Sequence, residues 1–210
     1  MTHLSDYNFF NRLGEKRFHW VDCCSGNHTD AEKWLSAKTG TGMDLMVHNE
    51  SGGGYGLTTG ASANGAIRMY PNIFMINPKD CGCTFLYKVS STTGGDCYIG
   101  MQSGTGAGGG DGVWTYPDAG WKGSSIKLYT KNDIGGNWVQ TGVTSDTNRH
   151  RIKLECQNDL VASMHVDGVI EASSTTFLPQ NKLQPMLQVQ SSSTNRVLDI
   201  GYYEAWSIWL

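Results

Sequence analysis

Apolar and polar side chains alternate along the C-terminal third of the chain. Ile152, Leu154 and Cys156 are separated by charged residues, and this period of two gives a strand one apolar face and one face in water. An Asp167-Gly168 step then lies between two short apolar runs. Such a step favours a tight hairpin, because both central residues of a type I′ turn need positive φ. The pattern predicts consecutive antiparallel strands.

Short apolar runs separated by turn residues continue along most of the chain. We expect about twelve strands at a spacing of roughly 8–15 residues, which is typical of two packed antiparallel sheets. A short helix is also expected over residues 30–38, with Asp30 as its cap and Trp34 on its apolar face. The predicted fold class is all-β: a two-sheet antiparallel jelly-roll sandwich over residues 19–210, preceded by an irregular N-terminal arm over residues 1–18.

Composition agrees with a sheet protein and excludes several kinds of partner. The chain has 210 residues, of which 27 are glycine and only 17% are charged. One domain is expected at this length. The net charge of −3 provides no basic face for nucleic acid, and no apolar run is long enough for a membrane-spanning helix. The first residues show no secretory leader, so we expect a protein that is made and used without Sec-type export.

The six cysteines give no metal or disulfide signature. They lie at positions 23, 24, 81, 83, 97 and 156. Their spacing matches no structural zinc pattern of paired C-x2-C units. The thiols of a protein that is not exported normally stay reduced. We therefore expect buried free thiols that pack as small apolar side chains.

Several glycine- and aromatic-rich segments stand out by their order along the chain. They include GGGYGLTTGASANGAI (52–67), FLYKVSS (85–91), DGVWTY (111–116) and VLDIGYYEAW (197–206). In this order and spacing, the chain from Trp20 onward resembles the concanavalin A-like (laminin G-like) jelly-roll domains of virion structural proteins of tailed phages. The resemblance implies a concanavalin A-like two-sheet jelly roll and a place in a set of particle-associated proteins.

This resemblance predicts a function based on adhesion. We expect a non-enzymatic structural protein in the virion of a tailed virus, either a capsid decoration (cement) protein or a head-fibre component, assembled in the host cytoplasm. It would need no cofactor, would contact capsid or tail subunits and would form homo-oligomers. The N-terminal arm is too apolar for a free tail, so we expect it to bury against a partner. The candidate interface residues are Phe9, Phe10, Phe18 and Trp20.

A cluster of aromatic residues beside a glycine-rich loop indicates an alternative function. The candidate carbohydrate-binding residues are Trp114, Tyr116, Trp121 and Trp138, with Tyr129 between them. Aromatic faces stack on sugars, and a few polar groups then fix the hydroxyls. The competing interpretation is core packing, since large aromatic side chains dominate the cores of such sandwiches. The alternative function is a glycan- or receptor-binding module on the same particle, acting in host attachment.

Polysaccharide hydrolysis is the third function considered, because the same fold hosts it. Retaining glycosidases need two carboxylates about 5–5.5 Å apart. In sandwich glucanases these come from one strand, in an E-x-D-x-x-E type of run, and no such run occurs here. Asp199 and Glu204 are five positions apart, so a regular strand points them to opposite faces. The sequence therefore predicts no catalytic residues and no enzyme.

Other possible sites are weaker. Residues 104–109 match G-x-G-x-x-G, but the residues that follow predict a strand, whereas a phosphate site needs a helix. His150 and His165 flank a hairpin and are interpreted as structural, hydrogen-bonded residues. Three aspartates in loops could contribute to a calcium site, but calcium needs six to eight oxygen ligands. They are Asp111, Asp118 and Asp133. No metal site is predicted.

Overall fold

The computed structural model describes residues 11–12, 15–22, 34–40, 44–47, 54–60, 65–71, 76–104, 110–117, 123–191 and 195–209. These residues form sixteen strands and no helix, in two sheets. Every pair of neighbouring strands is antiparallel. The prediction of an all-β, two-sheet jelly-roll sandwich is confirmed.

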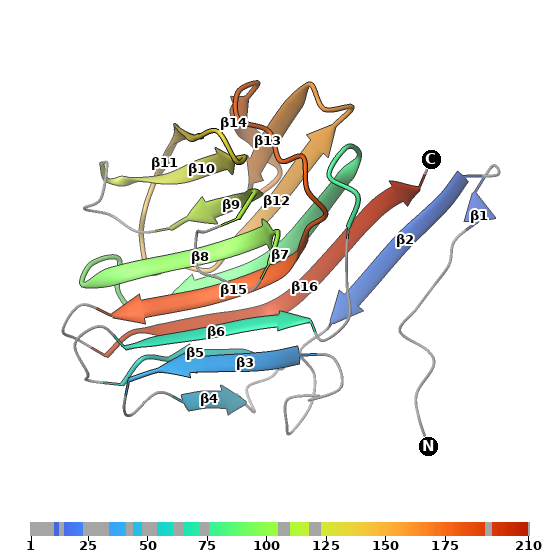
Figure 1. Cartoon of the computed structure of the whole chain (residues 1–210). Helices are drawn as coiled ribbons and strands as arrows, with labels where there is room; N and C mark the ends of the chain where they lie inside the picture. Colours follow the sequence, from blue (N-terminus) through green and yellow to red (C-terminus); the bar gives the residue numbers. More distant parts are fainter. Residues whose placement is uncertain are drawn as a thin grey trace, which may run out of the picture.

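The two sheets contain nine and seven strands. Sheet A consists of β1 (Asn11–Arg12), β2 (Glu15–Asp22), β16 (Val197–Trp209), β7 (Cys81–Val89), β12 (His150–Gln157), β13 (Val161–Val166) and β14 (Val169–Ser174), with β5 (Tyr55–Thr58) and β4 (Asp44–Val47) branching from β16. Sheet B has the order β11 (Gly136–Thr144), β10 (Ser125–Lys131), β9 (Gly112–Tyr116), β8 (Gly95–Gln102), β15 (Gln184–Ser191), β6 (Ala66–Pro71) and β3 (Trp34–Thr39). Figure 1 shows β8 and β15 lying across β7 and β16.

The hairpins follow the turn chemistry expected from the sequence. Asp167 and Gly168 join β13 to β14 with φ angles of 51° and 91°, as a type I′ turn requires. Asn158 and Asp159 join β12 to β13 with φ angles of 52° and 55°. Asn and Asp tolerate positive φ better than other non-glycine residues. Local sequence therefore fixes the order and direction of three consecutive strands of sheet A.

The expected helix over residues 30–38 is wrong. Residues 30–33 lie outside the described residues, and Trp34–Thr39 forms β3, which pairs with β6. Trp34 is 3% exposed and packs edge-on against Tyr203 of the opposite sheet, with the ring centroids 5.9 Å apart. Pairing with an exposed sheet edge and anchoring one large ring in the core outweigh the weak helix propensity of this segment.

The first strands extend sheet A into the segment assigned to the arm. β2 begins at Glu15 and pairs with β16, so the sheet begins before residue 19. Phe9 and Phe10 lie outside the described residues. Phe18 and Trp20 are in β2, opposite Ser207 and Ala205 of β16. Their contact with a partner subunit stays a prediction.

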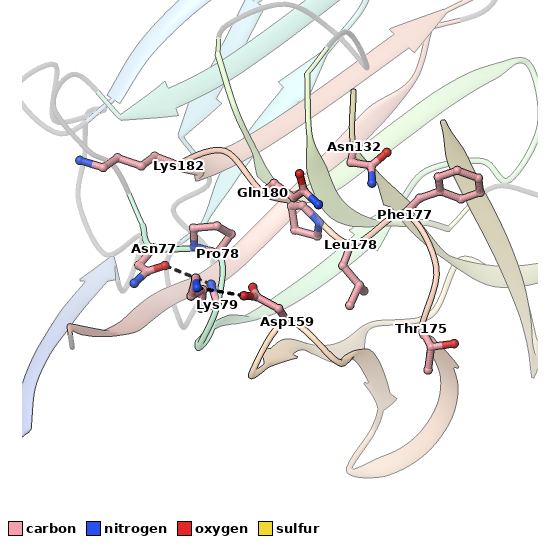
Figure 2. A pocket seen from close by; sticks show the side chains of 11 residues that line it. Asn77, Pro78, Lys79, Asn132, Asp159, Thr175, Phe177, Leu178, Gln180 and Lys182 are labelled. Atoms are coloured by element: carbon pink, nitrogen blue, oxygen red, sulfur yellow. Dashed lines mark hydrogen bonds and ion pairs between the residues drawn. The ribbon is translucent and has the colours of Figure 1, made fainter. Parts of the chain in front are cut away.

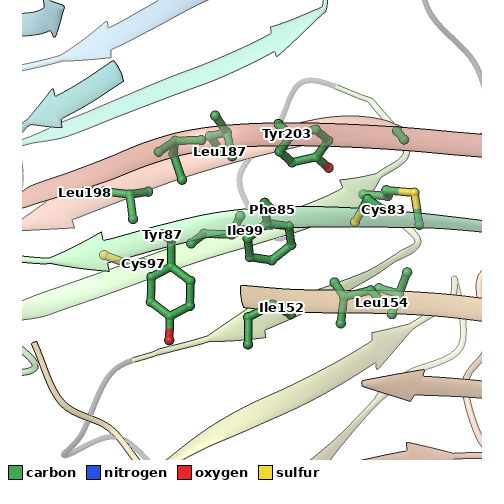
Figure 3. Packing of buried hydrophobic residues seen from close by; sticks show 14 of the residues in the cluster. Cys83, Phe85, Tyr87, Cys97, Ile99, Ile152, Leu154, Leu187, Leu198 and Tyr203 are labelled. Atoms are coloured by element: carbon green, nitrogen blue, oxygen red, sulfur yellow. The ribbon is translucent and has the colours of Figure 1, made fainter. Parts of the chain in front are cut away.

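The core lies between the two sheets and is almost entirely apolar (Figure 3). Phe85 and Tyr203 of sheet A stack with their centroids 5.7 Å apart. The Tyr203 hydroxyl donates a hydrogen bond of 2.7 Å to the Gly100 carbonyl of sheet B. A buried tyrosine needs such a partner. This bond therefore fixes the centre of β16 against the centre of β8.

The described cysteines are buried, as the sequence predicts. Cys81, Cys83, Cys97 and Cys156 are free thiols with little or no exposure. Burial raises the pKa of the Cys83 thiol to about 12, so it packs as a neutral side chain. Cys23 and Cys24 lie outside the described residues. No helix long and apolar enough to cross a membrane occurs among the residues that the structure describes.

Candidate functional site

The outer face of sheet B, which points away from the core, carries most of the predicted aromatic residues. In β8, Cys97, Ile99 and Met101 point into the core, so Tyr98, Gly100 and Gln102 point outward. Antiparallel register places Trp114 opposite Gly100, Tyr129 opposite Trp114, and Trp138 opposite Tyr129. We call this surface the aromatic face. Its rings are Tyr98, Trp114, Tyr116, Tyr129 and Trp138.

The five rings form one continuous cluster. The centroids of Tyr129 and Trp138 are 3.9 Å apart, and those of Tyr116 and Trp138 are 4.4 Å apart. Trp114 lies 4.6 Å from Tyr129, and Tyr98 lies 4.4 Å from Tyr116 in an edge-on contact. Close aromatic pairs of this kind contribute about 0.5–1.5 kcal/mol each beyond the area they bury. The cluster is therefore held by its own contacts as well as by the sheet.

Two glycines make room for the Trp114 ring. A Cβ atom at Gly112 would lie 2.4 Å from Cζ3 of Trp114, and a Cβ atom at Gly100 would lie 2.7 Å from its Cβ. Trp114 is consequently fully buried although it does not belong to the core between the sheets. Tyr116 is 7% exposed, whereas Tyr129 and Trp138 are partly exposed. Trp114 and Tyr116 are thus the buried rings of the cluster, whereas solvent can reach Tyr98, Tyr129 and Trp138.

The structure brings together three of the four predicted carbohydrate-binding residues. Trp114, Tyr116 and Trp138 all lie in the cluster, and Trp121 lies outside the described residues. Core packing and sugar binding were the two interpretations of these residues, with core packing favoured, and burial divides the cluster between the two. Tyr98 was missed, because its aromatic partners come from strands that only the sheet register places beside it.

Polar side chains flank the rings on the side of β15 and β6. Gln188 lies opposite both Tyr98 and Arg68, and its Oε1 accepts a hydrogen bond of 2.7 Å from Arg68 Nε. Gln188 is 1% exposed, and its Nε2 is buried without a hydrogen-bond partner in the described part of the chain. A buried unsatisfied donor costs about 1–3 kcal/mol. The aromatic face therefore holds a buried donor for which the described residues supply no acceptor.

Burial shifts the pKa values of two tyrosine hydroxyls and one guanidinium group on this face. Burial raises the pKa of Tyr116 far above its ordinary value, and the nearby Tyr98 adds to the effect. Burial also raises the pKa of Tyr129 and lowers that of Arg68. Both tyrosine hydroxyls consequently stay protonated through the physiological range. The rings present neutral donors and acceptors rather than charges.

The strands of sheet B contain few carboxylates. Asp96 of β8 is the one Asp or Glu in the strands of sheet B, all of which are described. It accepts a hydrogen bond of 3.3 Å from the Tyr98 hydroxyl, at the edge of the ring cluster. The described strands therefore provide one candidate acid on the aromatic face, and not the pair that glycoside hydrolysis requires.

The expectation that Asp199 and Glu204 point to opposite faces is wrong. A bulge between Ile200 and Tyr202 shifts the register of β16 against β7, which adds one residue and returns both acids to one face. That face is the outer face of sheet A. Asp199 and Glu204 lie opposite residues four positions apart in β7, so about 13 Å separates them along the strand. This is too far for a catalytic pair.

The remaining predicted sites also resolve into structural roles. His150 is clamped between Asp167 at 2.7 Å and Asp146 at 2.9 Å, and His165 lies 3.2 Å from Glu155. The two histidines do not form a pair.

The loop aspartates do not assemble a cation site in the described residues. The Asp111 carboxylate accepts hydrogen bonds from the main-chain nitrogens of Gln180 and Asn181, both at 2.9 Å, and Asp133 lies 3.3 Å from the Asn181 amide. Asp118 lies outside the described residues. No group of three potential metal ligands occurs where the structure is described.

Comparison with known proteins identifies the fold. No protein-family model matches the chain, and no curated protein matches it by sequence. Among solved structures it is similar to a β-glucanase of Mycobacterium abscessus (TM-score 0.66, 11% identity, covering 89% of this chain and 98% of that one). It is also similar to a Bacillus licheniformis β-glucanase (TM-score 0.63, 13% identity, covering 89% of this chain and 97% of that one). A third similar structure is the carbohydrate recognition domain of Emp47p (TM-score 0.63, 11% identity, covering 90% of this chain and 94% of that one).

These similarities correct the function expected from the sequence. The expectations of a virion structural protein and of a chain without enzymatic activity are contradicted by solved structures similar to this chain, which include β-glucanases and carbohydrate recognition domains. The concanavalin A-like jelly roll itself is confirmed. The sequence motifs that indicated a phage particle lie largely in strands, among them β9 and most of β16, and they report on the fold rather than on its setting.

Proposed function

We propose that this protein binds a neutral polysaccharide across the aromatic face of sheet B. The observation that carries the proposal is the single cluster of five rings on one sheet face, bordered by Gln188 and Arg68. Sugar rings have apolar C–H faces and polar rims, and a site for them needs aromatic surface with a few oriented polar groups. This arrangement matches that requirement.

Each part of the face has a separate role in the proposal. Tyr98, Tyr129 and Trp138 are the partly exposed rings, and of these Tyr129 and Trp138 stack on the sugar. Trp114 and Tyr116 lie beneath them and hold them in place. The buried Gln188 Nε2 donates to a hydroxyl oxygen of the sugar, which gives that donor the partner it lacks within the described chain. The fold similarity to glucanases and carbohydrate recognition domains supports the same substrate class.

Binding is tested by affinity electrophoresis and calorimetry against a panel of neutral polysaccharides that includes mixed-linkage β-1,3-1,4-glucan. Trp138→Ala should weaken binding at least about tenfold, which corresponds to about 1.4 kcal/mol. The matched control is Trp206→Ala, since Trp206 is a partly exposed tryptophan on the outer face of sheet A. The proposal fails if no polysaccharide binds, or if both variants lose affinity equally.

A second candidate function is hydrolysis of the bound polysaccharide. It is favoured by the β-glucanases among the similar structures and by the position of Asp96 on the aromatic face. In this function Asp96 transfers a proton to or from the reacting sugar oxygen, and a second carboxylate completes the pair. Release of reducing ends from mixed-linkage glucan should be lost in Asp96→Asn while binding remains. Glu204→Gln, on the opposite face, is the control, and absence of release from every polysaccharide tested would exclude hydrolysis.

A further inference from the structure

A pocket lies at one end of the sandwich, apart from the aromatic face (Figure 2). Its volume is about 670 Å³, within the range of about 300–1,000 Å³ typical of small-molecule sites. Four segments that are distant in sequence surround it: the residues before β7, the β10–β11 turn, the β12–β13 turn and the segment between β14 and β15. Its walls are therefore built by the tertiary fold.

One wall is apolar and is formed around Phe177. The Phe177 ring lies against Gly135, where a Cβ atom would be 2.7 Å from the ring Cε1. Phe177 is 36% exposed, and Leu178, Pro78 and Pro179 extend the apolar surface beside it. An aromatic ring that is supported on one side and partly exposed on the other provides a stacking surface.

Phe177 is also held in a strained backbone conformation. Its φ is 51°, which is unusual for a bulky residue, and such strain costs about 1–3 kcal/mol. Hydrogen bonds fix the segment on both sides. The Thr130 hydroxyl donates to the Thr176 carbonyl at 2.9 Å, and the main-chain N–H of Gln180 donates to Asp111 Oδ2 at 2.9 Å. The surrounding structure therefore imposes the position of this ring.

The opposite wall is polar and has one more positive than negative charge, because Lys182 lines the pocket in addition to Lys79 and Asp159. Lys79 Nζ and Asp159 Oδ2 form an ion pair at 3.3 Å, visible as a dashed line in Figure 2. The Oδ1 atom of Asn132 accepts hydrogen bonds from the main chain of Ile134 and Gly135. This fixes the Asn132 amide and leaves its Nδ2 without an acceptor in the described chain. Gln180 adds a further amide to the lining.

We propose that this pocket binds one neutral sugar residue, as a site separate from the aromatic face. The apolar C–H face of a pyranose ring fits on Phe177, and its hydroxyls pair with the Asn132 and Gln180 amides and with the Lys79–Asp159 ion pair. That pair offers a donor and an acceptor side by side, as adjacent sugar hydroxyls require. The ring and the two amides carry no charge, and they suit a neutral sugar.

The site is tested by ¹H–¹⁵N NMR titration of the full chain with methyl glycosides of glucose, galactose, mannose and N-acetylglucosamine. At least one glycoside should shift the main-chain amides of residues 132–135 and 177–181. Phe177→Ala should weaken that binding at least about tenfold. Phe177→Asn, whose new side chain tolerates positive φ, should lose binding equally without disturbing the fold.

The matched control is Ile134→Ala, which removes an apolar side chain that is 87% exposed on the same turn but is absent from the pocket lining. It should leave the affinity unchanged. Trp138→Ala should keep the monosaccharide signal even if it abolishes polysaccharide binding, so the two sites can fail independently. The proposal is overturned if no glycoside shifts these amides, if the Phe177 variants bind as the wild type does, or if methyl glucuronide binds more tightly than every neutral glycoside.

Discussion

The two outer faces of the sandwich differ in chemistry although the strands beneath them alternate in the same way. The outer face of sheet B holds stacked rings and amides and one carboxylate in its strands. The outer face of sheet A is crossed by charges that neutralise one another: Lys153 pairs with Glu155 at 2.7 Å, and His165 lies 3.2 Å from the same carboxylate. Paired charges of this kind are typical of a solvated surface, whereas a buried donor without a described acceptor, such as Gln188 Nε2, is suited to a ligand.

Each face also has one tryptophan that lies over a glycine. Trp114 on sheet B packs against Gly112, and Trp206 on sheet A lies over Gly82. Trp114 is completely buried by other rings, while Trp206 is partly exposed with Lys153 Nζ 5.8 Å from its ring. A tryptophan over a glycine is thus part of a packed ring cluster on sheet B, whereas on sheet A it is a single, partly exposed ring.

The largest expected difference between the faces is in stability. Trp114→Ala should lower the free energy of unfolding by about 3–5 kcal/mol, because it removes a fully buried ring and leaves a cavity. Trp206→Ala should cost less than about 2 kcal/mol, since its ring is partly exposed. Urea unfolding followed by circular dichroism measures both. Equal losses would mean that the aromatic face is no better packed than the outer face of sheet A.

The next largest effect concerns the unpaired donor. Gln188→Leu should reduce polysaccharide affinity at least about tenfold, while stability changes by no more than about 1 kcal/mol, because a buried unsatisfied amide is removed together with its bond to Arg68. Glu155→Gln on the other face should leave affinity unchanged. Calorimetric titration and urea unfolding provide the two readouts. A large loss of stability in Gln188→Leu would assign this residue to the scaffold instead.

A pH-dependent effect should be confined to sheet A. Burial opposes ionisation of His150, but hydrogen bonds to Asp167 and Asp146 raise its pKa overall. Burial opposes ionisation of both carboxyls, but hydrogen bonds from main-chain amides and His150 lower the pKa of each. The stability from protonated His150 is therefore complete below its ordinary pKa of about 6.5 and is lost as pH rises through the higher folded value. The carboxyl contribution is lost as pH falls through their lowered values.

The melting temperature should fall as pH rises from about 6.5 through the raised pKa of His150, and His150→Gln should flatten that part of the profile. Polysaccharide binding should not follow the same curve, because the raised pKa values of Tyr116 and Tyr129 keep the rings of the aromatic face protonated. Binding that tracked the melting profile would show that the two faces are coupled.

The smallest effect is expected from an exposed ion pair. Lys79→Met removes the partner of Asp159, but the two side chains are 60% and 44% exposed, and such pairs contribute about 0–1 kcal/mol. Urea unfolding should detect less than about 1 kcal/mol. A larger change would mean that this contact organises the end of the sandwich as well as lining the pocket there.

Local sequence determined much of sheet A. The alternation of Ile152, Leu154 and Cys156 and the Asp167-Gly168 turn were enough to predict β12, β13 and β14, because strand faces and tight turns depend on neighbouring residues alone. The same reasoning failed where a contact distant in sequence decided the outcome. Trp34–Thr39 became a strand through pairing with β6, and one extra residue in β16 reversed the face of Glu204, which follows it.

What the sequence by itself determined is an all-β sandwich with buried thiols and an unusual density of aromatic residues between positions 114 and 138. Only the tertiary structure decided which of those rings share a face, that Trp114 and Tyr116 support Tyr129 and Trp138 rather than fill the core, and that Gln188 lies beside them with no described residue as a partner for its Nε2. The reason is that sheet register places residues from distant strands about 5 Å apart. A single sequence does not contain that register.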